Sequence, residues 1–270
     1  MPDLLTSATL DDYARDGFAR SAGPVLPSDV VAGAVAGMDA VREGIYDTGQ
    51  APPPSPWNPG DDPNVLCKIE LPNAANHAIR ALLEHPRLGA FVAEATGAEA
   101  VQVWWVQLLV KPPTTEPDAA TAVGWHQDYL YWRDNWESPE GLLTAWVALS
   151  DVTGDAGPMS FVPGSQHWGL YEEGDFFGQD NDALRAGIAV PEGETWEEVM
   201  GTLPPGGVSL HHSLTFHGSG RNTSGRLRRS FAVHLRTERA VPTVMSGLTT
   251  HLDDFALNPV IYGDPAALPR

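Results

Sequence analysis

Apolar side chains recur at helical spacing in the first third of the chain. The clearest example lies in Ser28–Tyr46, where Ser28 is expected to cap a helix. The apolar stripe of that helix consists of Val30, Val31, Ala34, Val35, Met38 and Val41. Similar patterns predict helices over Thr9–Asp16 and over Asn76–Ala95, the latter interrupted before Pro86.

The period of the pattern changes near residue 100. Val101–Val110 is a long run of Val, Trp, Leu and Gln, which is typical of a strand buried on at least one face. Short strand-like segments separated by turn residues then follow, namely Val123–Gln127, Leu142–Leu149, Met159–Val162, Gly207–Leu210, Leu214–His217 and Arg228–Leu235. This spacing suits a sandwich or a jelly-roll barrel with helices packed outside. Of these we predict the second, a mainly β fold with flanking α-helices and a jelly-roll, cupin-like double-stranded β-helix core.

No internal repeat or linker divides the sequence, so one domain is expected over residues 1–270. Its expected parts are N-terminal helices over about 9–96, a jelly-roll core over about 100–237, an acidic insert over about 170–200 and a tail over 241–270. The insert has two interpretations. Its carboxylates either keep a solvated loop in water or belong to a lid that favours a neutral or cationic substrate.

Charge and cysteine content narrow the partners and the compartment. The formal net charge is −19, which disfavours nucleic acid and anionic membranes as partners. The single cysteine, Cys67, rules out an intramolecular disulfide. Met1–Leu10 has no signal-peptide pattern, and no apolar run approaches the roughly 18 residues of a membrane span. We therefore expect a cytoplasmic protein that acts on a small molecule.

The triplet His126-Gln127-Asp128 suggests a metal site. Side chains at i and i+2 of a strand point to the same face, so an imidazole and a carboxylate can converge on one ion. His217, about 90 residues later, offers a third ligand. Two histidines and one carboxylate form a facial triad that suits Fe(II), and zinc is the rival metal. The remaining nearby histidines, His167, His211, His212 and His234, are interpreted as structural or surface residues, although His212 is also a candidate for lining the cavity.

Arg228 is the candidate anchor for a co-substrate. Gly218–Gly225 is rich in turn residues and predicts a tight connection that returns the chain along a neighbouring strand, which brings Arg228 near the metal. A guanidinium clamps a carboxylate with two parallel hydrogen bonds, which suits the distal carboxylate of 2-oxoglutarate. Arg226 and Arg229 are the alternatives; alternation places Arg229 on the opposite face.

These motifs together resemble those of the phytanoyl-CoA dioxygenase family. The resemblance rests on Gly124–Asp128, on His217–Ser224 and on Arg228. Further similar segments are Tyr13–Gly17, Leu108–Pro113, Thr144–Leu149 and Gly157–His167. The similarity spans roughly Tyr13 to Leu235, most of the chain.

The resemblance implies an Fe(II)- and 2-oxoglutarate-dependent oxygenase. It implies iron bound by His126, Asp128 and His217, and 2-oxoglutarate held by Arg228 with help from Ser219. Lys68, Trp146 and Gln107 are further candidates for contact with the co-substrate. The implied reaction consumes O2, releases succinate and CO2, and hydroxylates a small organic molecule.

The substrate is expected to be a secondary metabolite or a modified amino acid. Basic residues are scarce, which disfavours a coenzyme A thioester. Candidate substrate contacts are Gln127, Tyr129, Trp132, Trp105 and His212, with Trp104, Tyr131 and Trp136 as further aromatic residues near the first motif. Alternatives are a desaturase or epimerase of the same family, a cupin-like isomerase or lyase that uses no 2-oxoglutarate, and a non-catalytic binding module, against which the intact triad argues.

Overall fold

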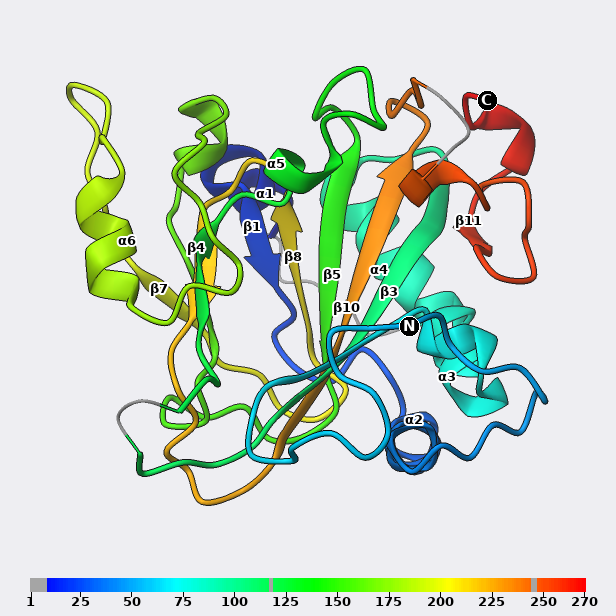
Figure 1. Ribbon diagram of the computed structural model, residues 1–270. Coiled ribbons are helices and arrows are strands. Elements are labelled where there is room, and N and C mark those ends of the chain that lie inside the picture. Colours follow the sequence, from blue (N-terminus) through cyan, green and yellow to red (C-terminus); the bar gives the residue numbers. More distant parts are fainter. Residues whose placement is uncertain (1–8, 117–118, 244–246) are drawn as a thin grey trace.

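Two antiparallel β-sheets face each other and enclose the interior of the protein (Figure 1). The computed structural model describes residues 9–116, 119–243 and 247–270. In spatial order the larger sheet contains β1 (Phe18–Arg20), β8 (Val208–His212), β5 (Leu142–Ala148), β10 (Arg228–Thr237), β3 (Val101–Lys111) and β11 (Val260–Tyr262), and β2 (Cys67–Glu70) also pairs with β3. The smaller sheet contains β4 (Val123–His126), β9 (His217–Ser219), β6 (Met159–Phe161) and β7 (Val199–Gly201). This arrangement is the predicted jelly roll.

Helices cover the outer face of the larger sheet (Figure 1). They are α1 (Thr9–Asp16), α2 (Ser28–Arg42), α3 (His77–Leu83) and α4 (Pro86–Thr96), while the short α5 (Tyr129–Trp132) and α6 (Asn181–Gly187) lie elsewhere. Single 3-10 turns occupy Pro72–Ala74, Ser165–His167, Gly247–Thr249 and Pro265–Ala267. The expected N-terminal helices and the break before Pro86 are confirmed. The prediction that Ser28 caps α2 is wrong, because Pro27 occupies the cap position and Ser28 is the first helical residue.

The alternation of side chains along β10 separates the core from the interior cavity. Phe231, Val233 and Leu235 point outward and pack in the main core against α2, α3 and α4. The residues between them point inward, toward the smaller sheet. Burial of each such apolar side chain stabilises the fold by roughly 1.5–3 kcal/mol, so the helices fix the sheet whose inner face carries the polar residues.

A β-bulge in β3 changes which residues face the interior. His234 pairs with Trp105 and Leu235 pairs with Val103, so Trp104 is an extra residue between the two pairs. Two residues of the bulged strand then oppose one of its partner, and the alternation shifts by one position. As a result Trp104 and Trp105 are adjacent in sequence and both line the same cavity.

Two details of the predicted β core are wrong. Leu214–His217 is not a strand, because residues 213–216 form a turn and the strand β9 begins at His217. The connection Gly218–Gly225 does not join neighbouring strands either, because β9 belongs to the smaller sheet and β10 to the larger one. It crosses between the sheets, so Arg228 approaches the site from the opposite wall.

The sequence patterns also missed several short elements. These are β1, β2, β7 and β11 at the margins of the sheets, together with α5 and α6. None is longer than seven residues, and so short a segment carries too few periods for its pattern to be recognised. Among the residues that the structure describes, no helix combines the length and the apolar character needed to cross a membrane.

Candidate metal centre and adjoining cavity

His126, Asp128 and His217 converge between the two sheets. The Nε2 atoms of both histidines lie 3.6 Å from Oδ1 of Asp128, and the three ligand atoms lie within 4.8 Å of one another. All three side chains are buried. Metal–nitrogen and metal–oxygen bonds of about 2.0–2.2 Å allow one ion to reach all three atoms.

Backbone carbonyls fix the orientation of both imidazoles. Nδ1 of His126 lies 2.8 Å from the carbonyl oxygen of Gly124, and Nδ1 of His217 lies 2.9 Å from that of Thr215. A carbonyl only accepts, so each Nδ1 carries the proton and donates it. Each Nε2 therefore presents a lone pair toward the other ligands, as metal coordination requires.

Asp128 reaches this position from outside strand β4. The strand ends at His126, and Asp128 has helical backbone angles (φ −58°, ψ −39°) at the start of α5. The expectation that both residues share one face of a strand is therefore wrong, although the two side chains do converge. Asp128 is held in place because Nε2 of Gln127 donates to the carbonyl of Leu214 (2.7 Å) and the amide of Tyr129 donates to that of Ser213 (2.9 Å).

One oxygen of Asp128 is occupied by protein donors and the other is free for a metal. Oδ2 accepts from the hydroxyl of Thr144 (2.7 Å) and lies 3.2 Å from Nε2 of His211. Burial alone would raise the pKa of Asp128, but the adjacent imidazoles of His217, His126 and His211 hold it well below its usual range. Asp128 is therefore a carboxylate, and burial keeps the pKa of His217 low enough for a neutral imidazole.

Arg228 lies beside this triad as a buried cation without an acidic partner. It is 1% exposed, and its Nη1 donates to the carbonyl oxygen of Gly157 (2.5 Å). Its Nε has no hydrogen-bond partner among the described residues, and no described carboxylate pairs with it. Burial lowers the pKa of Arg228 to about 9, which leaves the guanidinium charged at neutral pH. A buried, unpaired cation is costly, so this corner of the site fits an anionic ligand.

A second buried cation, Lys111, lies next to Ser219. Its Nζ donates to Oγ of Ser219 (2.6 Å) and to the carbonyl oxygen of Gly220 (2.5 Å). Because Oγ of Ser219 accepts from Lys111, its own hydrogen remains available to donate. Burial, and secondarily the nearby Arg228, lower the pKa of Lys111 well below its usual range.

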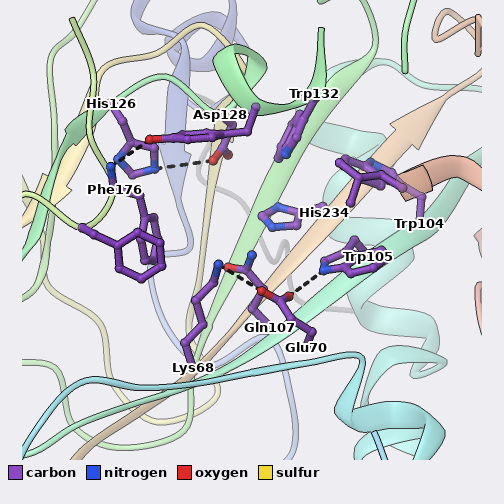
Figure 2. A pocket seen from close by; sticks show the side chains of 13 residues that line it. Lys68, Glu70, Trp104, Trp105, Gln107, His126, Asp128, Trp132, Phe176 and His234 are labelled. Carbon is purple, nitrogen blue, oxygen red and sulfur yellow. Dashed lines mark hydrogen bonds and ion pairs between the residues drawn. The ribbon is translucent and has the colours of Figure 1, made fainter. Parts of the chain in front are cut away.

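Two neighbouring cavities share His126 and Asp128 of the triad in their linings. The inner one holds about 30 Å³ and is lined by Arg228, Trp146, His211 and His217, among others. The outer one holds about 230 Å³ and is lined mainly by aromatic side chains (Figure 2). Gln107, His126, Asp128, Phe176 and His234 line both. Figure 2 also shows Lys68 and Trp105 converging on Glu70, at 3.0 Å and 2.6 Å.

The structure brings some of the candidate contacts to the cavity and excludes others. Gln107, Lys68, Trp105 and Trp132 line the outer cavity, as do Trp104 and Tyr131. Gln127 does not line it. Its side-chain amide donates hydrogen bonds to the carbonyls of Gly169 and Leu214 and accepts one from the amide of Tyr171. Tyr129 packs in an aromatic core with its hydroxyl on the carbonyl of Trp136.

His212 is also excluded from the site. It follows His211 on β8 and therefore points to the opposite face of the sheet, where it lines a separate hollow beside Tyr13 and Arg239. His211 and His234, interpreted from sequence as structural or surface residues, instead line the inner cavity. The period-2 alternation of β8 and β10 contained this information, because it places both histidines opposite the outward-facing apolar residues.

The acidic insert contributes a wall of the cavity. Two backbone hydrogen bonds join the insert to β4. The amide of Asp175 donates to the carbonyl of Trp125 (3.1 Å), and the amide of Gly124 donates to the carbonyl of Phe176 (3.1 Å). Phe176 and Phe177 then line the outer cavity. The insert is thus neither a purely solvated loop nor detached from the site, and no local pattern in the sequence distinguished these two phenylalanines.

Comparison with known proteins identifies the family of the chain. A family model described as Phytanoyl-CoA dioxygenase (PhyH) matches residues 13–230. The chain belongs to the phytanoyl-CoA dioxygenase family. The resemblance recognised in the motifs is therefore confirmed.

The chain is also similar to two curated proteins. The chain is 26% identical over 196 residues to a Stutzerimonas stutzeri protein named "Probable alpha-ketoglutarate-dependent hypophosphite dioxygenase", a match covering 70% of this chain and 63% of the relative. It is 30% identical over 120 residues to L-proline trans-4-hydroxylase of Streptomyces griseoviridis, covering 38% of this chain and 44% of the relative. The matches thus span less than two thirds of either relative.

Solved structures confirm the fold of this family member. The epimerase SnoN of nogalamycin biosynthesis, a non-heme alpha-ketoglutarate-dependent enzyme, aligns with a TM-score of 0.65 at 25% identity, covering 88% of this chain and 85% of SnoN. The carbocyclase SnoK of the same biosynthesis aligns with a TM-score of 0.68 at 23% identity, covering 95% and 96% of the two chains. The likeness to SnoK shows the shared jelly-roll fold alone.

Proposed function

We propose that this protein is an Fe(II)- and 2-oxoglutarate-dependent dioxygenase that hydroxylates a C–H bond of a small organic substrate. The observation that carries the proposal is a buried His126–Asp128–His217 cluster beside Arg228, a buried guanidinium that no described carboxylate pairs with. When iron is bound, it supplies the activation of O2 at the expense of 2-oxoglutarate, which gives succinate and CO2.

The chain's own residues divide the work between the two cavities. Arg228 would bind the distal carboxylate of 2-oxoglutarate in the inner cavity, where Trp146 packs beside it with the guanidinium carbon 5.1 Å from the ring centroid. Ser219, positioned by Lys111, would donate to the same carboxylate. Gln107 lines both cavities and would contact the keto-acid end, whereas Lys68 is paired with Glu70 and belongs to the outer cavity.

The unpaired guanidinium favours this function over its alternatives. A cupin-like isomerase or lyase that needs no keto acid would have no anion for Arg228, and a buried charge left unpaired is strongly destabilising. Fe(II) is favoured over zinc because three protein ligands on one side of the ion leave positions for a chelating keto acid and oxygen. The outer cavity opens next to the triad and would hold the substrate, a secondary metabolite or a modified amino acid.

We also propose that residues 1–270 act as one domain in the cytoplasm. The tail supports a single unit because β11 pairs with β3 at the edge of the larger sheet. Cys67 is a buried free thiol, which suits a reducing compartment.

An anaerobic titration tests the proposed function. Addition of Fe(II) and 2-oxoglutarate to the wild-type protein should give a weak visible absorption band, and subsequent oxygen should give succinate. His126→Ala should abolish the band, and Asp128→Ala should abolish hydroxylation, because two imidazoles alone hold the ion loosely. A wild-type protein that shows no band and releases no succinate would refute the proposal, as would wild-type turnover by Asp128→Ala.

A further inference from the structure

The described residues that line the outer cavity present no unpaired charge to a substrate. Apart from Asp128, whose carboxylate belongs to the metal cluster, the charged side chains lining it are Lys68 and Glu70. These two form an ion pair of 3.0 Å, and Nζ of Lys68 lies 4.6 Å from the ring centroid of Phe176. Glu70 also accepts from the indole of Trp105 at 2.6 Å. Both charges are satisfied within the protein, so an ionic substrate gains no partner and loses its hydration.

Apart from Gln107 and Leu248, the rest of the wall consists of rings, and it encloses a small volume. Indole, phenol and phenyl rings come from three segments, namely Trp104 and Trp105 on β3, Tyr131 and Trp132 on α5, and Phe176 and Phe177 on the insert. The cavity of about 230 Å³ is below the roughly 300–1,000 Å³ of drug-sized ligand pockets. Flat walls at this size fit a molecule of one or two rings.

His234 offers a polar group to this cavity, in addition to the amide of Gln107 that the proposed function assigns to the co-substrate. Its Nδ1 lies 2.8 Å from the hydroxyl oxygen of Thr144, which itself lies 2.7 Å from Oδ2 of Asp128. A hydroxyl has one hydrogen, and a carboxylate accepts only, so Thr144 donates to Asp128 and must accept from His234. The proton of the neutral imidazole is therefore on Nδ1.

The other ring nitrogen of His234 is consequently an acceptor. The only hydrogen bond of this ring among the described residues is the one through Nδ1, which leaves Nε2 without a partner, and the ring lines the cavity. The rings of Trp132 and Trp104 lie beside the imidazole of His234, with ring centroids 4.8 Å and 5.5 Å from its own (Figure 2). A lone pair in this apolar setting is costly unless a ligand donates a hydrogen bond to it.

We propose that the substrate is a neutral molecule of one or two rings that carries a hydroxyl or N–H group, and that this group donates a hydrogen bond to Nε2 of His234. The inference rests on the proposed function, since it assigns the substrate class of the same site. Thr144 links His234 to Asp128, so the substrate donor is placed at a fixed position relative to the metal cluster.

Four probes of one skeleton test the substrate class. They are 2-naphthol, 2-methoxynaphthalene, 2-naphthoate and 2-naphthylmethylammonium, titrated calorimetrically and anaerobically into the protein loaded with Fe(II) and 2-oxoglutarate. A neutral hydrogen bond of about 0.5–1.5 kcal/mol corresponds to a two- to tenfold tighter binding of the naphthol than of its methyl ether. The two charged probes should bind more weakly than the naphthol. Equal affinity for naphthol and ether, tighter binding of a charged probe, or binding by none of the four overturns the inference.

Two variants of His234 assign the effect to the correct nitrogen. In His234→Asn the amide NH2 replaces the Nδ1 donor to Thr144 but nothing replaces Nε2, so the preference for naphthol over its ether should disappear. In His234→Gln the amide oxygen lies near the position of Nε2, so the preference should persist. A preference retained in His234→Asn overturns the assignment.

Titration of the protein loaded with Fe(II) and 2-oxoglutarate distinguishes failure of the proposed substrate class from failure of the proposed function. The visible band of the Fe(II) and 2-oxoglutarate complex is recorded in each titration. If the wild-type protein forms no such complex, the proposed function fails and the inference fails with it. If the band forms but the probes do not discriminate, only the substrate class fails, and the wild-type comparison stands even if a variant does not fold.

Discussion

The hydroxyl of Thr144 donates a hydrogen bond of 2.7 Å to Oδ2 of Asp128. Together with His211 it occupies that oxygen and leaves Oδ1 to face His126 and His217. Partners of this kind orient a ligand, and their loss typically lowers metal affinity about 10- to 100-fold. Thr144 begins the segment Thr144–Leu149 that resembles the family, but neither Thr144 nor His211 was a candidate site residue in the sequence.

Thr144→Val should therefore weaken metal binding. The substitution preserves the branched shape but removes the donor, so we expect the dissociation constant for Fe(II) to rise about tenfold or more. Thr144→Ser retains a hydroxyl and should bind the metal nearly as well as the wild type. Anaerobic equilibrium dialysis measures both; equal Fe(II) affinity in Thr144→Val and the wild type would contradict the assigned role.

Arg228→Lys should raise the apparent KM for 2-oxoglutarate. The substitution keeps the positive charge but loses the planar pair of donors. A charge-assisted hydrogen bond is worth about 1.5–3 kcal/mol, so an increase of about tenfold to a hundredfold is expected. Succinate formation at varied 2-oxoglutarate concentration provides the measurement.

Arg229→Lys is the matched control for that experiment. Arg229 is adjacent in sequence but points to the other face of β10, where its Nη2 lies 3.2 Å from Asp39 on α2. Its replacement should leave the KM for 2-oxoglutarate as in the wild type. If Arg229→Lys raised the KM for 2-oxoglutarate more than Arg228→Lys did, the assignment of Arg228 as the residue that binds 2-oxoglutarate would be refuted.

The alternation of inward- and outward-facing side chains along the strands predicts the positions of several site residues. In β10 the outward positions of Phe231 and Val233 place His234 on the same inward face as Arg228, and the same rule in β5 points Thr144 inward between Leu143 and Ala145. The sequence-based interpretation of His234 as structural did not use this rule. Ligand residue types and their spacing were sufficient to find the triad.

Other parts of the site depend on features that local patterns do not encode. The bulge at Trp104 shifts the alternation of β3, and nothing in a run of apolar residues marks where such a shift occurs. Asp128 reaches the cluster from the start of a helix rather than from the strand assumed for it. Phe176 and Glu70 enter the cavity through long-range packing of the insert and of β2, which a short sequence window does not contain.

Gly174→Ala should disturb the metal site from the acidic insert. A Cβ at this position would lie 2.9 Å from Cα and 3.1 Å from Cβ of His126, closer than packed atoms allow. Overpacking of this kind typically costs about 1–3 kcal/mol, and here the strain falls on a ligand. We expect a lower melting temperature and a several-fold weaker Fe(II) affinity.

Gly154→Ala serves as the control for Gly174→Ala. A Cβ there would meet nothing within 4 Å, so stability and metal affinity should remain close to wild type. Thermal unfolding with and without Fe(II) compares the two variants. If Gly174→Ala bound the metal as the wild type does, the insert would not constrain His126.

The folded apo-protein should lose stability as the pH falls below neutrality, in part through His234. Burial lowers the pKa of His234 from 6.5 to about 4, because the charged ring would lose its hydration. Between these values the unfolded chain binds a proton that the folded chain does not bind. The free energy of unfolding therefore rises with pH in this window and falls as acid is added, by roughly 1–2 kcal/mol from pH 7 to pH 5 for this one residue.

His234→Asn removes the titrating ring and should flatten this dependence. Urea unfolding of the apo-protein at pH 7 and pH 5 should show a smaller decrease in the variant than in the wild type. His77 is exposed at the start of α3, and His77→Asn is the matched control, which should show the wild-type decrease. An identical decrease in His234→Asn and the wild type would mean that the folded protein accommodates a charged ring at this position, and the neutral tautomer assigned to His234 would then be wrong.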